Sequence, residues 1–126
     1  MSALDRLKTL FWWLPFGQVS EISAAELNRL IAEECPLQIL DVRTGTEWRR
    51  SRISGAVSVP IQELKQRIAS LQLDPKLPIV AICLSAHRSI PAVRLLQVHG
   101  YDSAVQLQGG MMAWWNRDYP TKGEQQ

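Results

Sequence analysis

Hydrophobic and polar positions follow two alternating rhythms along this chain. Apolar runs of strand length occupy residues 19–22, 37–42, 55–60, 78–83 and 103–108. Between these runs, apolar residues recur every three or four positions, which is the spacing of an amphipathic helix. Strands that alternate with helices predict an α/β domain whose mostly parallel sheet is covered by helices on both faces.

The starts and ends of the predicted helices carry local signals. Ser23 with Glu26, and Thr44 with Glu47, have the spacing of a capping box. They predict helices over residues 24–33 and from 45 to 50. Further helices are predicted over residues 61–71, 89–99 and 109–120, the second of them stopped by Gly100.

The N-terminal segment has an apolar stripe of its own. Over residues 2–14 the stripe is spaced like one helix face, and Pro15 follows it: the members are Leu4, Leu7, Leu10, Phe11 and Leu14. We therefore predict an amphipathic helix and linker over residues 1–17. Its apolar face either docks on this domain or a second copy, or lies on a membrane as a peripheral anchor, with Trp12 and Trp13 at the interface.

Composition narrows the class of protein. The 126 residues suit one domain, which we place at 18–120 and follow with a polar tail at 121–126. A formal net charge of +2 gives no reason to expect nucleic-acid binding. No apolar run approaches the roughly 20 residues of a membrane span, and we find no signal peptide. Two cysteines favour a reducing, cytoplasmic compartment, and neither a metal site nor a cofactor is expected.

One stretch, "CLSAHRS" at 83–89, suggests chemistry. Cys83 ends an apolar strand, and Arg88 and Ser89 stand at the entry to the next helix. A thiolate is the reactive form of cysteine, and a nearby cation or a helix N-terminus stabilises it. Ligands of parallel sheets bind beyond the carboxyl ends of the strands, where Cys83 is expected. From the residues alone, the alternative is a small buried hydrophobe.

Four segments, in order, resemble the single-domain rhodaneses, or sulfurtransferases. They are "ISAAEL", "ILDVRTGTEWRRSRISGAVSVP", "VAICLSAHRS" and "LQGGMMAWWNRDYP". The third is similar to the family's active-site loop, usually C-x-x-G-x-R-S, and the fourth to its closing GG-x-x-AW…P segment. The resemblance covers roughly residues 18–120 and implies a rhodanese fold, a five-stranded parallel sheet between helices.

The resemblance also implies a reaction and its residues. Cys83 would take a sulfane sulfur from a small anionic donor such as thiosulfate and pass it to a thiol or protein acceptor. The loop residues that would hold the donor and the persulfide are Leu84, Ser85, Ala86, His87, Arg88 and Ser89. Arg88 would bind the donor or brace the loop. Asp41, Arg43 and Glu47 match the family's DVR…E positions and would support the site; their alternative roles are salt bridges and, for Glu47, helix capping.

Two other functions remain as alternatives: a phosphatase or arsenate reductase, and a docking module. Related phosphatases and arsenate reductases carry five residues between cysteine and arginine, whereas four separate Cys83 from Arg88 here, which favours sulfur over phosphorus. The usual loop glycine is replaced by Ala86, which would be strained if the position needs a positive φ. Leu84 replaces a residue that is often basic. These departures leave open a docking module with little catalysis. Cys35 is interpreted as a helix-end residue, with a resolving thiol as the alternative.

Overall fold

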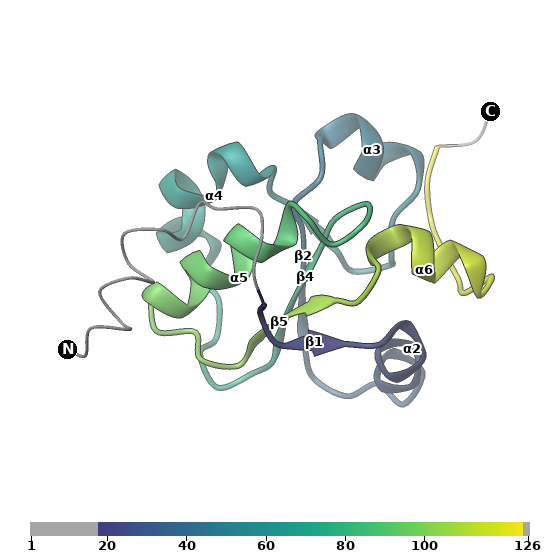
Figure 1. Ribbon diagram of the computed structural model, residues 1–126, viewed down its shortest axis with the longest axis horizontal. Helices are drawn as coiled ribbons and strands as arrows, with labels where there is room; N and C mark the ends of the chain where they lie inside the picture. Colours follow the sequence, from purple (N-terminus) through teal and green to yellow (C-terminus); the bar gives the residue numbers. More distant parts are fainter. Residues whose placement is uncertain (1–17, 125–126) are drawn as a thin grey trace.

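The computed structural model describes residues 18–124. It is an α/β domain in which strands and helices alternate from the first strand to the last helix (Figure 1). In chain order the elements are β1 (Glu21–Ile22), α2 (Ala24–Ala32), β2 (Gln38–Asp41), α3 (Gly45–Arg50), β3 (Val57–Ser58), α4 (Ile61–Arg67), the 3-10 helix η1 (Ile68–Leu71), β4 (Ile79–Ile82), α5 (Ser89–Val98), β5 (Ala104–Leu107) and α6 (Gly110–Asn116).

The five strands form one parallel sheet, as the sequence predicts. Their order is β1-β5-β4-β2-β3, so β4 lies in the centre between β5 and β2. The last residues of β2 and β4, Asp41 and Ile82, are register partners. The loops that follow these two strands therefore leave the same edge of the sheet side by side, and that edge carries the site.

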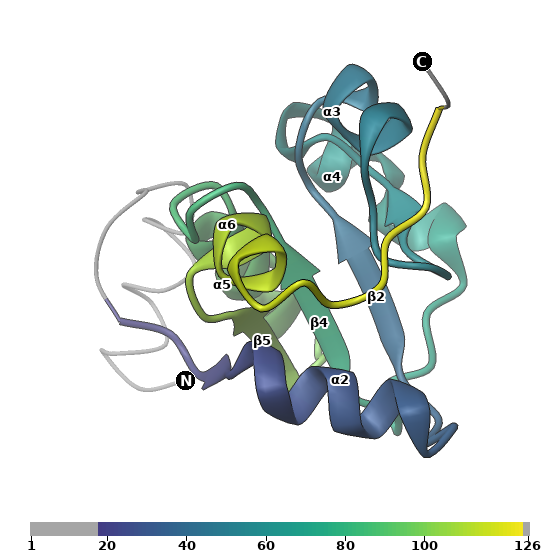
Figure 2. The same cartoon turned by 90° about the vertical axis from the view of Figure 1, so that its right-hand side faces the viewer.

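The sheet buries a separate hydrophobic core on each face. On one face α4, η1 and α5 pack against Ile79 and Ala81 of β4 and against Cys83, the residue that follows it. On the other face α2 and α6 pack against Val80 and Ile82. Figure 2, turned by 90° from Figure 1, shows α2 along the sheet with α6 above it. The strict alternation along β4 directs the Cys83 side chain toward α5.

The observed elements are shorter than the expected ones at several ends. The predicted strand at 55–60 pairs as a strand only at Val57–Ser58, since Gly55 lies in a turn with φ +87° and Pro60 lacks an N–H for the ladder. The stripe at 61–71 changes from α4 to a 3-10 helix and ends at Gln72, whose φ is +54°. The closing helix stops at Asn116 instead of residue 120.

Two further predictions concern the chain ends. The amphipathic helix predicted over residues 2–14 lies outside the described residues. Within residues 18–124, no helix combines the length and apolar character needed to cross a membrane. Part of the polar tail is held in place: Lys122 exchanges two backbone hydrogen bonds with Arg52, and the Glu124 amide donates to the Arg49 carbonyl.

Candidate active site

Cys83 directly follows β4 and is 1% exposed. Its Sγ lies 3.5 Å from the Oγ of Ser89, the first residue of α5. The thiol therefore stands against the N-terminal turn of a ten-residue helix, whose free amides carry a partial positive charge. The structure thus brings together Cys83 and the start of the helix at Ser89, which the sequence placed at the two ends of one loop.

The loop from Leu84 to Arg88 has a shape that glycine would adopt more readily than alanine. Ala86 has φ +72°, so the residue that replaces the usual glycine lies in the left-handed region. The Ser85 hydroxyl lies 3.0 Å from Nδ1 of His87, and both side chains are exposed. None of the amides of residues 84–88 donates to a described backbone group. Successive unpaired amides around a left-handed residue form a concavity suited to an anion.

Helix α6 fixes the first part of this loop. The amides of Met111 and Met112 donate to the carbonyl oxygens of Cys83 (2.8 Å) and Leu84 (3.1 Å). Gly110 allows this approach, because a Cβ there would lie 2.5 Å from the Leu84 oxygen and closer still to that of Cys83. The second glycine of the "GG" pair is therefore a packing requirement of the site.

Arg88 is braced by Glu47, a residue 41 positions earlier in the chain. The two guanidinium nitrogens Nη1 and Nη2 donate to Oε1 and Oε2 at 2.7 and 3.0 Å. Glu47 also accepts from Thr44 in the capping box of α3. The hydrogen bonds from Arg88, and then those from Thr44, lower the pKa of the Glu47 carboxyl to about 2, although burial opposes the change. The pKa of Arg88 is correspondingly raised, chiefly by its hydrogen bond to Glu47.

Asp41 and Arg43 form a second, fully buried ion pair at the end of β2. They are 0% and 1% exposed. Arg43 donates from Nε and Nη2 to the Asp41 carboxylate, at 2.9 and 2.6 Å, and from Nη2 to the Ser51 carbonyl. The pair fixes the turn between β2 and α3, so it positions Glu47. Neither charged group reaches the surface.

Sequence reasoning named Ser89 as a loop residue but missed its partner Gln106 and, beyond that, Glu21. Ser89 donates to Oε1 of Gln106 at 2.6 Å, and Nε2 of Gln106 donates to Glu21 at 2.9 Å. Gln106 is only 4% exposed and lies in β5, next to β4. The available signal was a glutamine inside an apolar strand. The chain pattern gave no means of identifying its partners, which lie 17 and 85 residues away.

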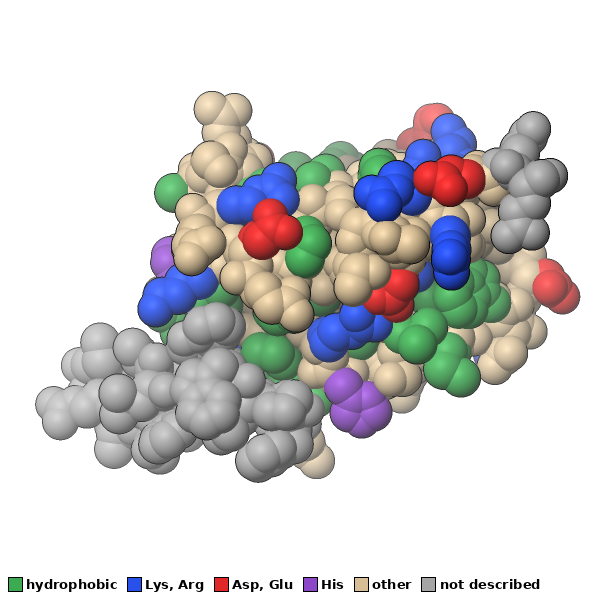
Figure 3. Space-filling view, turned by 90° about the horizontal axis from the view of Figure 1, so that it is seen from above, with side chains coloured by type: hydrophobic (Ala, Val, Ile, Leu, Met, Phe, Trp, Pro, Cys, Tyr) green, Lys and Arg blue, Asp and Glu red, His purple; other side chains and the backbone are tan. Residues whose placement is uncertain are grey.

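The molecular face at the carboxyl ends of the strands is mixed in character. Figure 3 looks onto this face and shows exposed hydrophobic side chains among acidic and basic ones over α3 and α6. Met112 and Trp115, on α6, are 50% and 38% exposed. The Trp115 ring also lies 6.0 Å from the Arg43 guanidinium carbon. The mouth of the site is therefore partly apolar.

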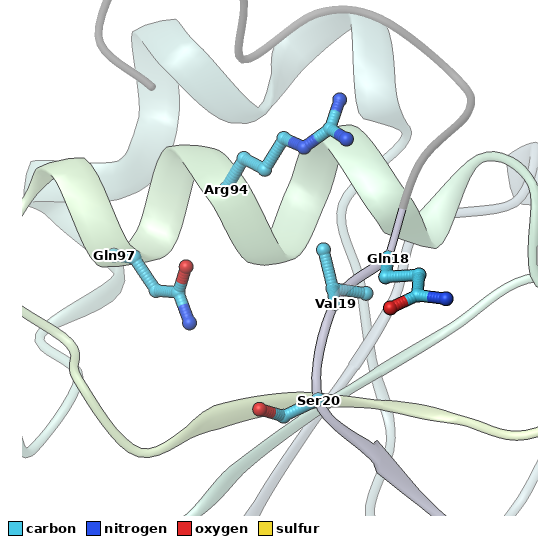
Figure 4. Close-up of a pocket in the computed structure, with 5 residues that line it drawn as sticks. All are labelled: Gln18, Val19, Ser20, Arg94 and Gln97. Atoms are coloured by element: carbon cyan, nitrogen blue, oxygen red, sulfur yellow. The ribbon is translucent and has the colours of Figure 1, made fainter. Parts of the chain in front are cut away.

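Other described features lie apart from the loop. A cavity of about 390 Å³ between the start of β1 and α5 is lined by Gln18, Val19, Ser20, Arg94 and Gln97, with no loop residue among them (Figure 4). Cys35 precedes β2, whereas Cys83 follows β4. Since these strands run parallel and in register, the two cysteines lie at opposite edges of the sheet, roughly 13 Å or more apart along the strand direction. Cys35 is thus out of reach as a resolving thiol. The described residues also hold no cluster of three His, Cys, Asp or Glu side chains suited to a metal ion.

Comparison with known proteins agrees with this geometry. The family model described as Rhodanese-like domain matches residues 23–117. A sulfurtransferase of Allochromatium vinosum is 28% identical over 102 residues, covering 81% of this chain and 94% of that protein. The thiosulfate sulfurtransferase GlpE of Shewanella oneidensis is 29% identical over 98 residues, covering 76% and 95%. The solution structure of a rhodanese-like domain from Anabaena superposes with a TM-score of 0.75 at 30% identity, covering 85% and 81%.

Proposed function

This chain belongs to the family of rhodanese-like domains, and from that premise we propose that it transfers a sulfane sulfur through a persulfide on Cys83. Its relatives support a sulfurtransferase in general terms. The observation that carries the proposal is the placement of the Cys83 thiol at the N-terminus of α5, enclosed by a loop whose amides from 84 to 88 donate to no described backbone group. Such a loop suits an anion held against a sulfur nucleophile.

The proposed reaction has two steps. In the first, the Cys83 thiolate attacks the outer sulfur of thiosulfate. A new S–S bond forms, the S–S bond inside thiosulfate breaks, and sulfite leaves with the electron pair. In the second, an acceptor thiolate, or cyanide in the assay, attacks the outer sulfur of the persulfide. The bond to Sγ breaks and the Cys83 thiolate is regenerated.

The surrounding residues have supporting roles in this proposal. The loop amides stabilise the negative outer sulfur of the persulfide and the donor oxygens. Arg88 keeps the loop closed through Glu47 and adds positive charge near the sulfur. The partly apolar mouth, with Leu84 in place of a basic residue, suits an acceptor that is a protein or a thiol with an apolar part.

The experiment is the intact mass of the protein before and after thiosulfate, and again after cyanide. We expect a gain of one sulfur atom that cyanide removes. Cys83→Ala should show no gain, and Cys35→Ala, the matched control, should gain sulfur like the wild type. A gain that persists in Cys83→Ala would refute the assignment of the nucleophile.

If neither thiosulfate nor an organic persulfide loads the wild-type protein, the sulfurtransferase proposal fails. The structural observation that favours the remaining candidate, a docking module, is the strained Ala86 within the loop. A phosphatase is disfavoured by the four-residue spacing, since a loop of this size has fewer amides to surround a phosphate.

A further inference from the structure

A chain of three hydrogen bonds connects the buried sulfur of Cys83 to the surface. We call Glu21, Gln106 and Ser89 the polar relay. Its distances, from the surface inward, are 2.9 Å from Gln106 Nε2 to Glu21, 2.6 Å from Ser89 Oγ to Gln106 Oε1, and 3.5 Å from Ser89 Oγ to Cys83 Sγ. Glu21 is exposed and lines, with Gln106, a cavity of about 250 Å³.

The chemistry of these groups allows only one direction of donation. A carboxylate accepts and does not donate, so the NH₂ group of Gln106 must face Glu21. Its carbonyl oxygen consequently faces Ser89, and this oxygen only accepts. Ser89 has one hydroxyl proton, which is committed to Gln106. Toward Cys83 the serine presents a lone pair, which accepts from an S–H but repels a thiolate.

We propose that the polar relay is a positioning device that favours the states of Cys83 in which Sγ is uncharged. In the thiol, S–H donates to Ser89 and every group in the relay is satisfied. In the persulfide, the negative charge lies on the outer sulfur, and Sγ is again neutral. Only the free thiolate conflicts with the relay: if Ser89 turns to stabilise it, the buried Gln106 oxygen loses its donor.

This inference rests on the proposed function for the role of Cys83 as nucleophile and deepens it. The relay disfavours the free thiolate while no donor is present, and it favours the reaction that loads sulfur onto Cys83. The groups that act in the other direction are the N-terminus of α5 and the Arg88 guanidinium, which carries the ion pair with Glu47. Among the described residues, the remaining titratable groups around the sulfur are His87 in the loop and the buried pair of Asp41 with Arg43. All of them stay the same when only the relay is changed.

The test is a titration of the Cys83 thiolate by its ultraviolet absorbance in the full chain with Cys35→Ser. The signal of the same protein with Cys83→Ser is subtracted. Gln106→Leu frees the Ser89 hydroxyl to donate to the thiolate. A hydrogen bond to a charged group is strong enough to move the pH midpoint down by about one unit, a tenfold change in the thiolate fraction below the midpoint. Glu21→Gln, at an exposed position, releases the orientation of Gln106 and should give a smaller change in the same direction.

Two further variants separate the relay from a structural effect. Ser89→Ala removes both the acceptor of the Cys83 S–H and the lone pair that repels the thiolate, so the midpoint should fall. The fall should be no more than a few tenths of a unit, because no hydroxyl is left to donate to the sulfur. The double variant Ser89→Ala/Gln106→Leu should match Ser89→Ala. The proposal is overturned if Glu21→Gln and Gln106→Leu both leave the midpoint unchanged. It is also overturned if the double variant still shows the full decrease, or if Ser89→Ala raises the midpoint by a unit. The titration needs no sulfur donor, so its result can be interpreted even if the protein does not load sulfur. A failure to load sulfur would refute the proposed function alone.

Discussion

The pair of Arg88 and Glu47 is the contact whose removal tests the site most directly. Glu47→Gln keeps the size of the side chain and its ability to accept from Thr44, but removes the charge. The pKa of Glu47 is lowered from 4.5 to about 2, chiefly by the hydrogen bond from Arg88. At about 1.36 kcal/mol per pH unit, that difference corresponds to about 3.4 kcal/mol. The two side chains are 34% and 29% exposed, and solvent screens the pair, so we expect a loss of about 2 kcal/mol.

The direction of the Glu47 pKa shift determines how the effect of Glu47→Gln depends on pH. Since the folded pKa is the lower one, the ionised carboxylate contributes its full stability above pH 4.5. The contribution is lost as the pH falls from 4.5 toward 2, where the wild type also carries a neutral side chain. The difference in unfolding free energy between wild type and Glu47→Gln should therefore be largest at neutral pH and shrink across this interval.

Urea denaturation of both proteins, at neutral pH and at several values between 4.5 and 2, measures the difference. Glu63→Gln is the matched control, because Glu63 pairs with Arg67 at 3.5 Å on the surface, where both side chains are about half exposed. We expect an effect below about 0.5 kcal/mol for this control. A difference for Glu47→Gln that stays constant down to pH 2, or that is no larger than the control, would refute the reasoning.

Two substitutions test the backbone of the loop. Ala86→Gly removes the cost of a left-handed alanine and should raise the unfolding free energy by about 0.5–1 kcal/mol, after allowance for the more flexible unfolded chain. In contrast, Ala25→Gly in α2 should lower the unfolding free energy, and a decrease for both variants would contradict the argument. Gly110→Ala forces a Cβ against the carbonyls of Cys83 and Leu84. It should lower the unfolding free energy by about 2–4 kcal/mol and abolish sulfur loading. Gly100→Ala, with φ +91° but open space around it, should cost clearly less, and equal costs would assign the effect to φ alone.

The elements and their starts were predictable because their causes are local. The N-caps at Ser23 and Thr44 form as expected, and their hydroxyls accept from the amides of Glu26 and Glu47 at 3.1 and 3.2 Å. The reciprocal glutamate bond that completes a capping box is present at Thr44 but not at Ser23. The apolar run of β4 is buried on both faces, as its composition indicates. Element ends were less predictable, since the length of the edge strand β3 depends on how long its partner β2 stays in register.

The contacts that build the site could not be derived from periodicity. The distance along the chain from Arg88 to Glu47 is 41 residues, and Gln106 meets Ser89 only because β5 lies beside β4. A pattern of strands and helices indicates which side chains are buried, but it does not give the order of the strands in the sheet. The family resemblance implied a five-stranded parallel sheet between helices. It did not supply the relay, which depends on a glutamine in this chain.

Glu47 shows why the alternatives drawn from the sequence need not compete. Helix capping and support of the active site were separate interpretations of this residue, and the structure contains both sets of contacts. A carboxylate has about four acceptor positions, enough for the Thr44 amide and hydroxyl together with two guanidinium nitrogens. One side chain therefore fixes the start of α3 and the orientation of Arg88 at once. Because the Thr44 contacts restrain Glu47 independently of Arg88, the bidentate pair costs less conformational entropy than a pair between two free side chains.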